Sequence, residues 1–529
     1  MDKSHPSQAP LGDTGFTLEA PANPIPYFFA TLLAAFFIYS MQGSKINLPS
    51  ANPKNFFELT NSRPKKYYLH NARSIMARWF SANPNKPMKM VSDMDESIVL
   101  PPSMANEIRS HKDLSFAEFS EVFFQTKYPG FEAFAVGNHS SPLLTVINKD
   151  LTKQLAKVTE PLADETSLAL KHTFTENKAW HAIHMRNTVL EVIARVSSRV
   201  FLGTELCRNE VWLDITKNYT LDGFSAGERL RDFSPFVRPF VHWFLPVCQS
   251  ARKRVRESAT IIQPIIDKRN ALKAQAVAEG KPEPEYLDAI EWFERAAQAN
   301  GVKLDPSLCQ LFLSTVAIHT TTDLMGQVLV DLAKNPGIIK DLQEEVLKTL
   351  KESGWKKNSL YNMKLLDSVI KESQRLKPLQ LASMQRIATA DVTLSDGTFI
   401  PKGACVSVSS HALWDPEVYP EPEKWDGYRF YRLREEAGKE NFAQLVSTAP
   451  EHLGFGHGKH ACPGRFFAAN EIKIVLAHIL LQYEWRLPVD AKAYIFDYGN
   501  AAIMNPHLEI EIRRRADEVD LEKFLEQLV

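Results

Sequence analysis

One cysteine in the C-terminal part of the chain stands in a setting that suits a metal ligand. Cys462 lies in the run FGHGKHACPGR at residues 455–465. Gly456 and Gly458 permit tight turns before the cysteine, and Pro463 suits the first turn of a following helix. Backbone N–H groups and the dipole at a helix start stabilise a thiolate. A thiolate on such a loop is the proximal ligand with which a haem iron favours O–O cleavage, so the sequence predicts a haem-thiolate site.

The competing interpretation is a buried structural cysteine beside a glycine turn, which is the commoner role of a lone cysteine. Several positions around Cys462 agree with the ligand role at once, and this agreement favours the ligand. The remaining cysteines are far apart, without the spacing of a zinc site or a redox dithiol: Cys207, Cys248, Cys309 and Cys405. We therefore expect no disulfide framework and a reducing compartment.

The cysteine loop resembles the haem-binding motif of the cytochrome P450 family, Phe-Gly-x-Gly-x-Arg-x-Cys-x-Gly. The matching positions are Phe455, Gly456, Gly458, Cys462 and Gly464. His460 stands where the family has an arginine that helps to hold a haem propionate. A histidine is fully charged only below its ordinary pKa of about 6.5. The resemblance implies that haem b (iron protoporphyrin IX) binds to this loop through Cys462, with His460 near a propionate.

A threonine run is the second candidate for chemistry. Residues 317–322 read AIHTTT, and threonine hydroxyls inside a helix compete for backbone carbonyls and bend it. The run resembles the family's oxygen-activation motif, Ala-Gly-x-Asp/Glu-Thr-Thr, which implies catalytic roles for Thr321 in proton delivery and for the neighbouring Thr320. Ile318 replaces the glycine and Thr320 the acid, which leaves water or His319 to take the place of the acid. Without the cysteine loop, the run would be only a threonine-rich helix.

Three charged residues have the spacing of a structural network. Glu372 and Arg375 share one face of a predicted helix, and they resemble the family's Glu-x-x-Arg motif. Arg429 is placed to complete a trio that positions the cysteine loop and does no chemistry. Arg386 resembles the arginine that reaches a haem propionate; the alternative is an arginine on the surface of a strand.

The elements that must position these residues are mainly helical. Asp305 caps a predicted helix that runs to about Lys334. Trp180 and His184 resemble an i, i+4 pair on a haem-flanking helix; a core tryptophan beside a surface histidine is the alternative. The sequence further predicts helices over 180–201, 252–280 and 463–483, a hairpin over 391–400 and a turn or hairpin over 500–506. The fold class is thus mainly α with small β-sheets, and the resemblance implies the haem-thiolate fold with an N-terminal transmembrane helix.

Composition fits a globular enzyme. The chain has 529 residues, 44% of them hydrophobic and 24% charged, with a formal net charge of −1. This composition excludes a chain that is disordered throughout. The near-zero net charge creates no overall positive potential that would attract nucleic acid. The predicted organisation is a disordered tail over 1–24, a membrane anchor over 25–41, a linker over 42–60 and the catalytic domain over 61–529.

The anchor prediction rests on the apolar run IPYFFATLLAAFFIYSM at residues 25–41. The run is slightly shorter than the roughly 20 residues that span a bilayer, and Tyr27 and Tyr39 suit its two interfaces. Lys45 and Lys54 follow it, which weakly favours a cytosolic C-terminal part. A buried or interfacial helix is the alternative.

The resemblance implies an enzyme that inserts one oxygen atom from O₂ into a C–H bond. Electrons would come from NADPH through a membrane-bound cytochrome P450 reductase, which Lys459 and Arg465 would meet. Several runs look like those of fungal secondary-metabolism members, so we expect a terpenoid or meroterpenoid substrate and the endoplasmic reticulum membrane. The substrate pocket should be apolar, and its candidate lining is Phe312, Val316, Ala317, 379–384 and 501–504. The alternatives are a polyketide substrate, a reductase-independent isomerase or dehydratase, and a haem-binding sensor without turnover.

Overall fold

The computed structural model describes residues 45–58, 60–136 and 146–516, together with Ile25, Tyr27, Ala30 and Thr31. The tail predicted over 1–24 and nearly all of the anchor predicted over 25–41 lie outside these residues. Among the residues that are described, no helix combines the length and the apolar character needed to cross a membrane. The described part of the predicted linker packs along the first strand, where the Ala51 N–H donates to the Lys89 carbonyl at 2.9 Å.

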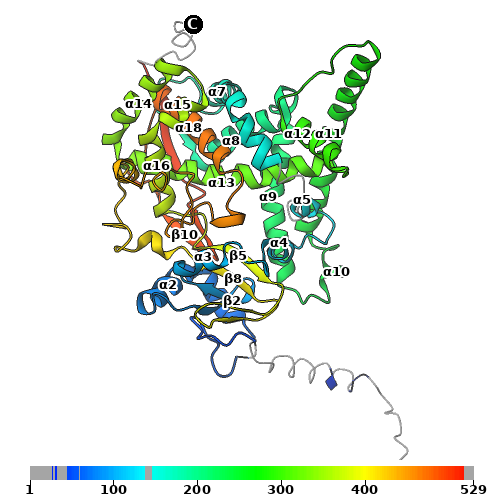
Figure 1. The fold of residues 1–529 in the computed structure, drawn as a ribbon, viewed down its shortest axis with the longest axis vertical. Helices are drawn as coiled ribbons and strands as arrows, with labels where there is room; N and C mark the ends of the chain where they lie inside the picture. The colour runs from blue at the N-terminus through cyan, green and yellow to red at the C-terminus, as the bar shows by residue number, and fades with distance from the viewer. Residues whose placement is uncertain are drawn as a thin grey trace, which may run out of the picture.

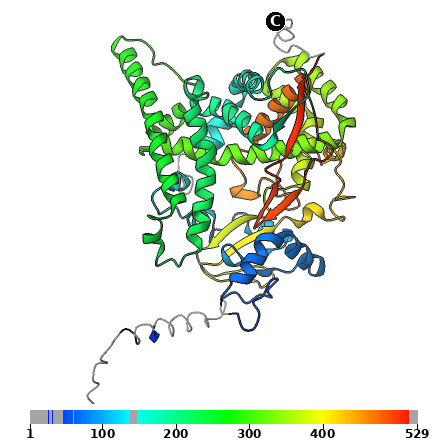
Figure 2. The same cartoon turned by 180° about the vertical axis from the view of Figure 1, so that it is seen from behind.

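Helices make up most of the structure, as the sequence predicts. Their bounds are α2 Ser62–Ala82, α3 Ala105–Ile108, α4 Phe116–Phe124, α5 Glu132–Val136, α7 Thr152–Thr173, α8 Met185–Leu206, α9 Glu210–Arg231, α10 Arg238–Val241, α11 Pro246–Ala278, α12 Ala289–Asn300, α13 Pro306–Lys334, α14 Ile339–Ser353, α15 Lys357–Asn362, α16 Lys364–Leu376, α17 Arg429–Glu435 and α18 Arg465–Gln482. Figure 1 shows α13 crossing the middle of the molecule, and Figure 2 shows the same helix from behind.

Small β-sheets complete the structure, and the largest of them lies at the opposite end from most of the helices (Figure 1). The largest has the order β1-β2-β8-β5-β3, with β2 and β8 parallel and the other neighbours antiparallel. Its strands are β1 Met88–Ser92, β2 Asp95–Leu100, β8 Cys405–Ser409, β5 Ala382–Ala388 and β3 Leu114–Ser115. The remaining strands are β4 His181–His184, β12 Glu509–Arg514 and β9 Tyr483–Arg486 in one sheet, and the hairpins β6 Val392–Thr393 with β7 Phe399–Ile400 and β10 Ile495–Tyr498 with β11 Ala501–Met504. The first hairpin confirms the prediction over 391–400, whereas the second begins at Ile495, earlier than the turn or hairpin predicted over 500–506.

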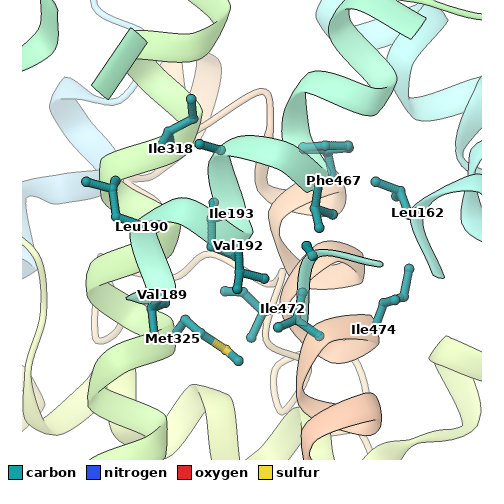
Figure 3. Close-up of a cluster of buried hydrophobic side chains, with 14 of the residues drawn as sticks. Leu162, Val189, Leu190, Val192, Ile193, Ile318, Met325, Phe467, Ile472 and Ile474 are labelled. Carbon is teal, nitrogen blue, oxygen red and sulfur yellow. The ribbon is translucent and has the colours of Figure 1, made fainter. Parts of the chain in front are cut away.

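The main core lies where α8, α13 and α18 pack together. Figure 3 shows Leu190 of α8 and Ile318 of α13 on one side of this core, with Phe467 and Ile472 of α18 on the other. All four are buried. The packed apolar side chains supply the hydrophobic stabilisation that holds the central helix against the helix following the cysteine loop.

The central helix begins and ends where its sequence predicts. The Asp305 carboxylate accepts hydrogen bonds from the N–H groups of Ser307 and Leu308, and α13 ends at Lys334. The hydroxyls of Thr320 and Thr322 donate to carbonyls one turn back, at 2.9 and 2.7 Å. The helix nevertheless runs unbroken through the threonine run.

The helix predicted over 180–201 is wrong at its start. His181–His184 forms strand β4, which pairs with β12 through a register that sets His184 opposite Glu509. Trp180 therefore lies outside any helix, with the guanidinium carbons of Arg486 and Arg513 at 4.3 and 4.7 Å from its ring centre. The i, i+4 pair of Trp180 and His184 on a helix does not exist, because pairing with a distant strand overrides the local helical pattern.

A buried histidine on α18 makes stability depend on pH. Neither ring nitrogen of His478 has a hydrogen-bond partner among the described residues, and its ring stacks on Trp355 at 4.9 Å. Burial, helped by Arg514 and Lys171, lowers the pKa of His478 to about 3. Between pH 7 and pH 5 only the unfolded chain gains this proton, because an unfolded histidine titrates near about 6.5. This difference lowers the free energy of unfolding of the wild type by about 2 kcal/mol between pH 7 and pH 5. His478→Phe should abolish that decrease, as measured by denaturant unfolding at the two pH values. The wild type is measured alongside, and equal pH profiles for the variant and the wild type would contradict the prediction.

Candidate active site

The loop that carries Cys462 is closed by its own backbone. The Cys462 N–H donates to the Phe455 carbonyl at 2.8 Å, and Arg465 Nη1 donates to the Cys462 carbonyl at 2.8 Å. Gly456 and Gly458 have φ angles of +69° and +77°, which side chains with a Cβ rarely adopt. The loop is thus rigid, and Cys462 lies three residues before the start of α18.

The surroundings of the Cys462 sulfur have opposing effects on the pKa of its thiol. Burial raises the pKa of the Cys462 thiol, whereas the N–H groups of Gly464 and Arg465 and the charge of Arg465 favour the thiolate. A metal ion bound to a thiol deprotonates it outright. The donors at the helix start therefore suit a sulfur that is anionic when it holds a metal.

The two sides of the loop differ in packing. A Cβ added at Gly458 would lie 2.4 Å from the Cβ of Arg109, so the loop presses closely on the end of α3. His457 Nε2 is within 2.9 Å of Asn106 Oδ1, a second link to α3. A Cβ at Gly464 would meet no heavy atom within 4 Å. The loop is thus fixed on one side and leaves room for another group at Gly464.

Arg386 and His460 come together around Phe116. The Arg386 guanidinium carbon lies 5.7 Å from the Phe116 ring centre, and the His460 ring centre lies 6.1 Å from it. Arg386 on β5 is buried; its Nη1 donates to the Gln385 carbonyl, and its Nε has no partner among the described residues. Burial lowers the pKa of Arg386 to about 10, and burial with Arg386 and Lys459 lowers the pKa of His460 to about 4.

A buried guanidinium without an acid partner is costly unless an anion compensates it. No carboxylate among the described residues acts on Arg386, whose recorded hydrogen bond goes to a backbone carbonyl. A haem propionate beside the Cys462 loop would supply the missing negative charge, so the residues present fit the group that the sequence predicts. His460, with its lowered pKa, would contribute a hydrogen bond there and no charge near neutral pH.

Removal of this cation should weaken haem retention and spare the apoprotein. A hydrogen bond to a charged group contributes about 1.5–3 kcal/mol, so Arg386→Met should speed haem transfer to a scavenging apoprotein by roughly 10–100-fold. The free energy of unfolding of the apoprotein should not fall, because the substitution breaks no ion pair between Arg386 and a carboxylate of the protein. The exposed Arg229→Met is the control. If Arg386→Met lost haem no faster than the wild type, the Arg386 guanidinium would not be a propionate ligand.

The predicted structural trio is confirmed. Glu372 and Arg375 are buried and pair at 2.8 Å, and Arg429 Nε lies 3.1 Å from both Glu372 oxygens. Arg375 Nη1 also donates to the carbonyls of Leu413 and Pro422, at 2.6 and 2.7 Å. The network ties α16 to the segment that precedes the cysteine loop.

One stripe of the central helix α13 consists of partly or largely exposed side chains, and we call it the open face of α13: Phe312, Val316, Thr320 and Leu324. Val316 is 45% exposed although it sits on the central helix. Thr320 lies on this face, whereas Thr321 is buried. Thr320 is thus the more exposed of the two residues, although its hydroxyl donates to the Val316 carbonyl at 2.9 Å, and the catalytic roles of both threonines stay predictions. His319 Nε2 instead contacts the Lys217 carbonyl on α9 at 2.8 Å, and burial lowers the pKa of His319 to about 4.

The two other segments predicted to line a pocket lie beside each other. The Leu381 N–H donates to the Asn500 carbonyl at 2.9 Å, and the Asn500 side chain bonds to the Ala382 backbone in both directions at 2.7 Å. Leu379, close to this junction, is exposed. Sequence reasoning missed Asn500 and the loop anchor His457, because their partners are distant in the chain.

Comparisons with known proteins agree with this geometry. Residues 88–513 match the family model described as cytochrome P450. The chain is 49% identical to cytochrome P450 monooxygenase hepE of Aspergillus oryzae, over 88% of this chain and 86% of that protein. It is 45% identical to cytochrome P450 monooxygenase TRI1 of Fusarium sporotrichioides, over 90% and 88% of the two chains. A retinoic acid-bound cyanobacterial CYP120A1 shares the fold, with a TM-score of 0.66 and 18% identity over 89% of this chain and all of the other.

Proposed function

Because the chain belongs to the cytochrome P450 family, we propose that it is a membrane-anchored monooxygenase that oxidises a hydrophobic polycyclic intermediate of a fungal biosynthetic pathway. A terpenoid or meroterpenoid is the proposed substrate, and a polyketide scaffold is the alternative. The observation that carries the proposal is the open face of α13, whose side chains other than Thr320 are all apolar. Apolar side chains that line a binding site recognise a substrate through its shape and its apolar surface.

Different residues of the chain would have different roles around the haem. Cys462 would hold the iron from the loop side, and Arg386 with His460 would hold a propionate. Haem bound through a thiolate supplies the means to cleave the O–O bond of O₂. Thr320 and Thr321 on α13 would hold and move protons, and the apolar residues of the open face would orient the substrate and exclude water.

Electrons and location belong to the same proposal. NADPH would supply electrons through a cytochrome P450 reductase, which would meet the basic residue Lys459 beside the cysteine loop. Lys459 is exposed, as such a contact requires. The apolar run over 25–41 would anchor the chain in the endoplasmic reticulum membrane, with the catalytic part in the cytosol.

One observation favours a second candidate, a reductase-independent isomerase or dehydratase. Thr320 stands where the family motif has an acid, and a weakened proton supply would matter less to an enzyme that does not consume O₂. Turnover without NADPH would support this candidate. Tight binding of lipophilic compounds without any turnover would instead indicate a haem-binding sensor.

The proposal is tested with the full-length chain and a reductase in lipid nanodiscs. Polycyclic terpenoids, meroterpenoids and polyketides are first screened for a shift of the Soret band on binding. Those that bind are incubated with NADPH under ¹⁸O₂, and products are analysed by mass spectrometry. We expect a terpenoid or meroterpenoid product that carries one ¹⁸O atom. Conversion that proceeds without NADPH, or products that lack ¹⁸O, would contradict the proposed monooxygenation.

A further inference from the structure

His319, in the threonine run of α13, links this helix to α9. Its Nε2 lies 2.8 Å from the Lys217 carbonyl in the middle of α9. A carbonyl only accepts hydrogen bonds, so Nε2 carries the proton and donates it. Burial lowers the pKa of His319 to about 4, so the ring stays neutral and keeps this donor near neutral pH. His319 has no part in the function proposed above, although it stands beside Thr320 of the open face.

The residue of α9 that accepts this hydrogen bond also joins α9 to α8. Lys217 Nζ lies 2.5 Å from Glu191 Oε2 of α8, and Glu191 pairs with Arg195 at 2.8 Å. Arg195 in turn pairs with Glu210, the first residue of α9, at 2.5 Å. The N-terminal half of α9 is thus held to α8 by ion pairs and to α13 by the hydrogen bond from His319.

The other end of α9 is bound to a different element, the β10–β11 hairpin. The Tyr498 hydroxyl of β10 donates to Glu228 Oε1 at 2.5 Å. This hydrogen bond, together with burial, raises the pKa of Tyr498 to about 12, so the phenol remains a donor near neutral pH. In the part of the chain that the structure describes, no other hydrogen bond joins α9 to the hairpin. Tyr498 is 38% exposed, so water can replace its partner.

The hairpin is held in place by elements other than α9. At its turn, the Gly499 N–H donates to the Leu69 carbonyl of α2 at 2.8 Å. At the end of β11, Met504 packs on α13, where a Cβ added at Gly326 would lie 2.8 Å from the Met504 Cε. The hairpin therefore rests on α2 and α13 and does not need α9 for its position.

These contacts join three elements into a closed ring beside the open face. We call this ring the α9 frame: residues 319–326 of α13, residues 217–228 of α9 and the β10–β11 hairpin. At 1.5 Å per residue, its side along α13 is about 10 Å long and its side along α9 about 16 Å. Thr320 and Leu324 of the open face lie on the α13 side. Two of the three junctions are single hydrogen bonds, and only the one at His319 is supported by ion pairs.

We propose that bulky apolar molecules reach the open face of α13 through the α9 frame, which opens at the Glu228–Tyr498 hydrogen bond and is held at the His319–Lys217 hydrogen bond. The proposal rests on the function proposed above, because it concerns the substrate of that site. An exposed single hydrogen bond breaks in local opening at little cost, which suits the junction that opens. His319 and Tyr498 are positioning residues, since they limit the size of what enters and touch no reacting atom.

Two matched pairs of variants isolate the two hydrogen bonds. Tyr498→Phe removes one hydroxyl and keeps the ring, and Tyr494→Phe is its control, because the exposed Tyr494 hydroxyl bonds to no described residue. His319→Leu removes the donor, whereas His319→Gln places an amide N–H where Nε2 stood. The Lys217 carbonyl keeps the helical N–H four residues later, so neither variant at His319 leaves it without a donor, and the fold should survive.

Imidazole and clotrimazole are the probes, because both bind a haem iron through the same type of ring nitrogen and clotrimazole adds a bulky triarylmethyl group. The full-length, haem-loaded protein in nanodiscs is mixed with each probe in a stopped-flow spectrometer, and the shift of the Soret band gives the association rate. Loss of one hydrogen bond should accelerate clotrimazole by about two- to tenfold. We expect this gain in Tyr498→Phe and His319→Leu, with the imidazole rate unchanged. His319→Gln and Tyr494→Phe should match the wild type with both probes.

A reversible bridge tests the opposite change. In the double variant Glu228→Cys with Tyr498→Cys, a bifunctional methanethiosulfonate joins the two positions and holds this junction closed. The bridge should slow clotrimazole and spare imidazole, and its reduction should restore the clotrimazole rate. Wild-type clotrimazole rates in Tyr498→Phe, in His319→Leu or in the bridged protein would overturn the passage. Equal acceleration of both probes would also overturn it, because the change would then lie at the haem and not on the way to it.

The dithionite–CO spectrum separates failure of the passage from failure of the proposed function. It is recorded first for every protein. A wild type without the thiolate band would sink both, since the passage leads to a haem-thiolate site. With a normal band, rates that do not depend on ligand size refute the passage alone. Size-dependent rates in a protein that oxidises nothing with NADPH and reductase would refute the monooxygenase function and leave the passage standing.

Discussion

Cys462→Ala is expected to abolish NADPH-dependent oxygenation while the protein stays folded. Changes to residues that merely support a metal ligand cost roughly 10–100-fold in activity, so loss of the ligand itself should cost more than about 100-fold. The fold should survive because the hydrogen bonds that Cys462 makes in the loop come from its backbone N–H and carbonyl groups. Product formation and far-ultraviolet circular dichroism of the variant are the measurements.

Cys405→Ala is the matched control for this variant. Cys405 is a buried cysteine on β8, and burial raises the pKa of its thiol to about 12. A thiol of this kind is inert, so Cys405→Ala should keep its haem and its activity. Substantial oxygenation by Cys462→Ala, or an equal loss in the two variants, would rule out Cys462 as the iron ligand.

Among the substitutions named here, Glu372→Gln is expected to lower the free energy of unfolding the most. Glu372 is the acceptor for both Arg375 and Arg429, and it also accepts the Asp426 N–H at 3.1 Å. With the carboxylate removed, two guanidinium groups lose their acid partner, one of them fully buried. Removal of one partner from a buried ion pair costs about 3–5 kcal/mol. We expect a loss of at least this size in denaturant unfolding, and little haem incorporation during expression.

An exposed pair of similar spacing provides the comparison. Glu421 and Lys424 pair at 3.3 Å, and both side chains are about two-thirds or more exposed, at 72% and 67%. Exposed pairs contribute about 0–1 kcal/mol, so Glu421→Gln should be nearly neutral. If Glu372→Gln cost no more than Glu421→Gln, the trio would not be what holds α16 to the segment before the cysteine loop.

Local signals predicted much of the fold. The capping aspartate and proline at residues 305 and 306 placed the start of α13 correctly, because a cap acts within one turn of the helix. The pairing of Glu372 with Arg375 followed from i, i+3 spacing on one helix. The hairpin over 391–400 followed from its turn residues. In each case the decisive contact lies within a few residues of the signal.

Distant contacts account for what the sequence did not predict. Trp180 lies before a strand because β4 pairs with β12, which is more than 300 residues later in the chain. His457 holds the cysteine loop through Asn106, and Asn500 joins two segments of the predicted pocket wall. The difference between the exposed Thr320 and the buried Thr321 likewise depends on tertiary packing.

The most direct test of the haem-thiolate site is the carbon monoxide difference spectrum of the reduced wild-type protein. The full-length chain is reduced with dithionite, and carbon monoxide is added to one of two matched samples. A strongly red-shifted Soret band is the predicted result, because it reports a thiolate bound to the haem iron. Folded protein that contains no haem, or a Soret band at the position typical of a neutral ligand, would contradict the assignment of Cys462 as the iron ligand.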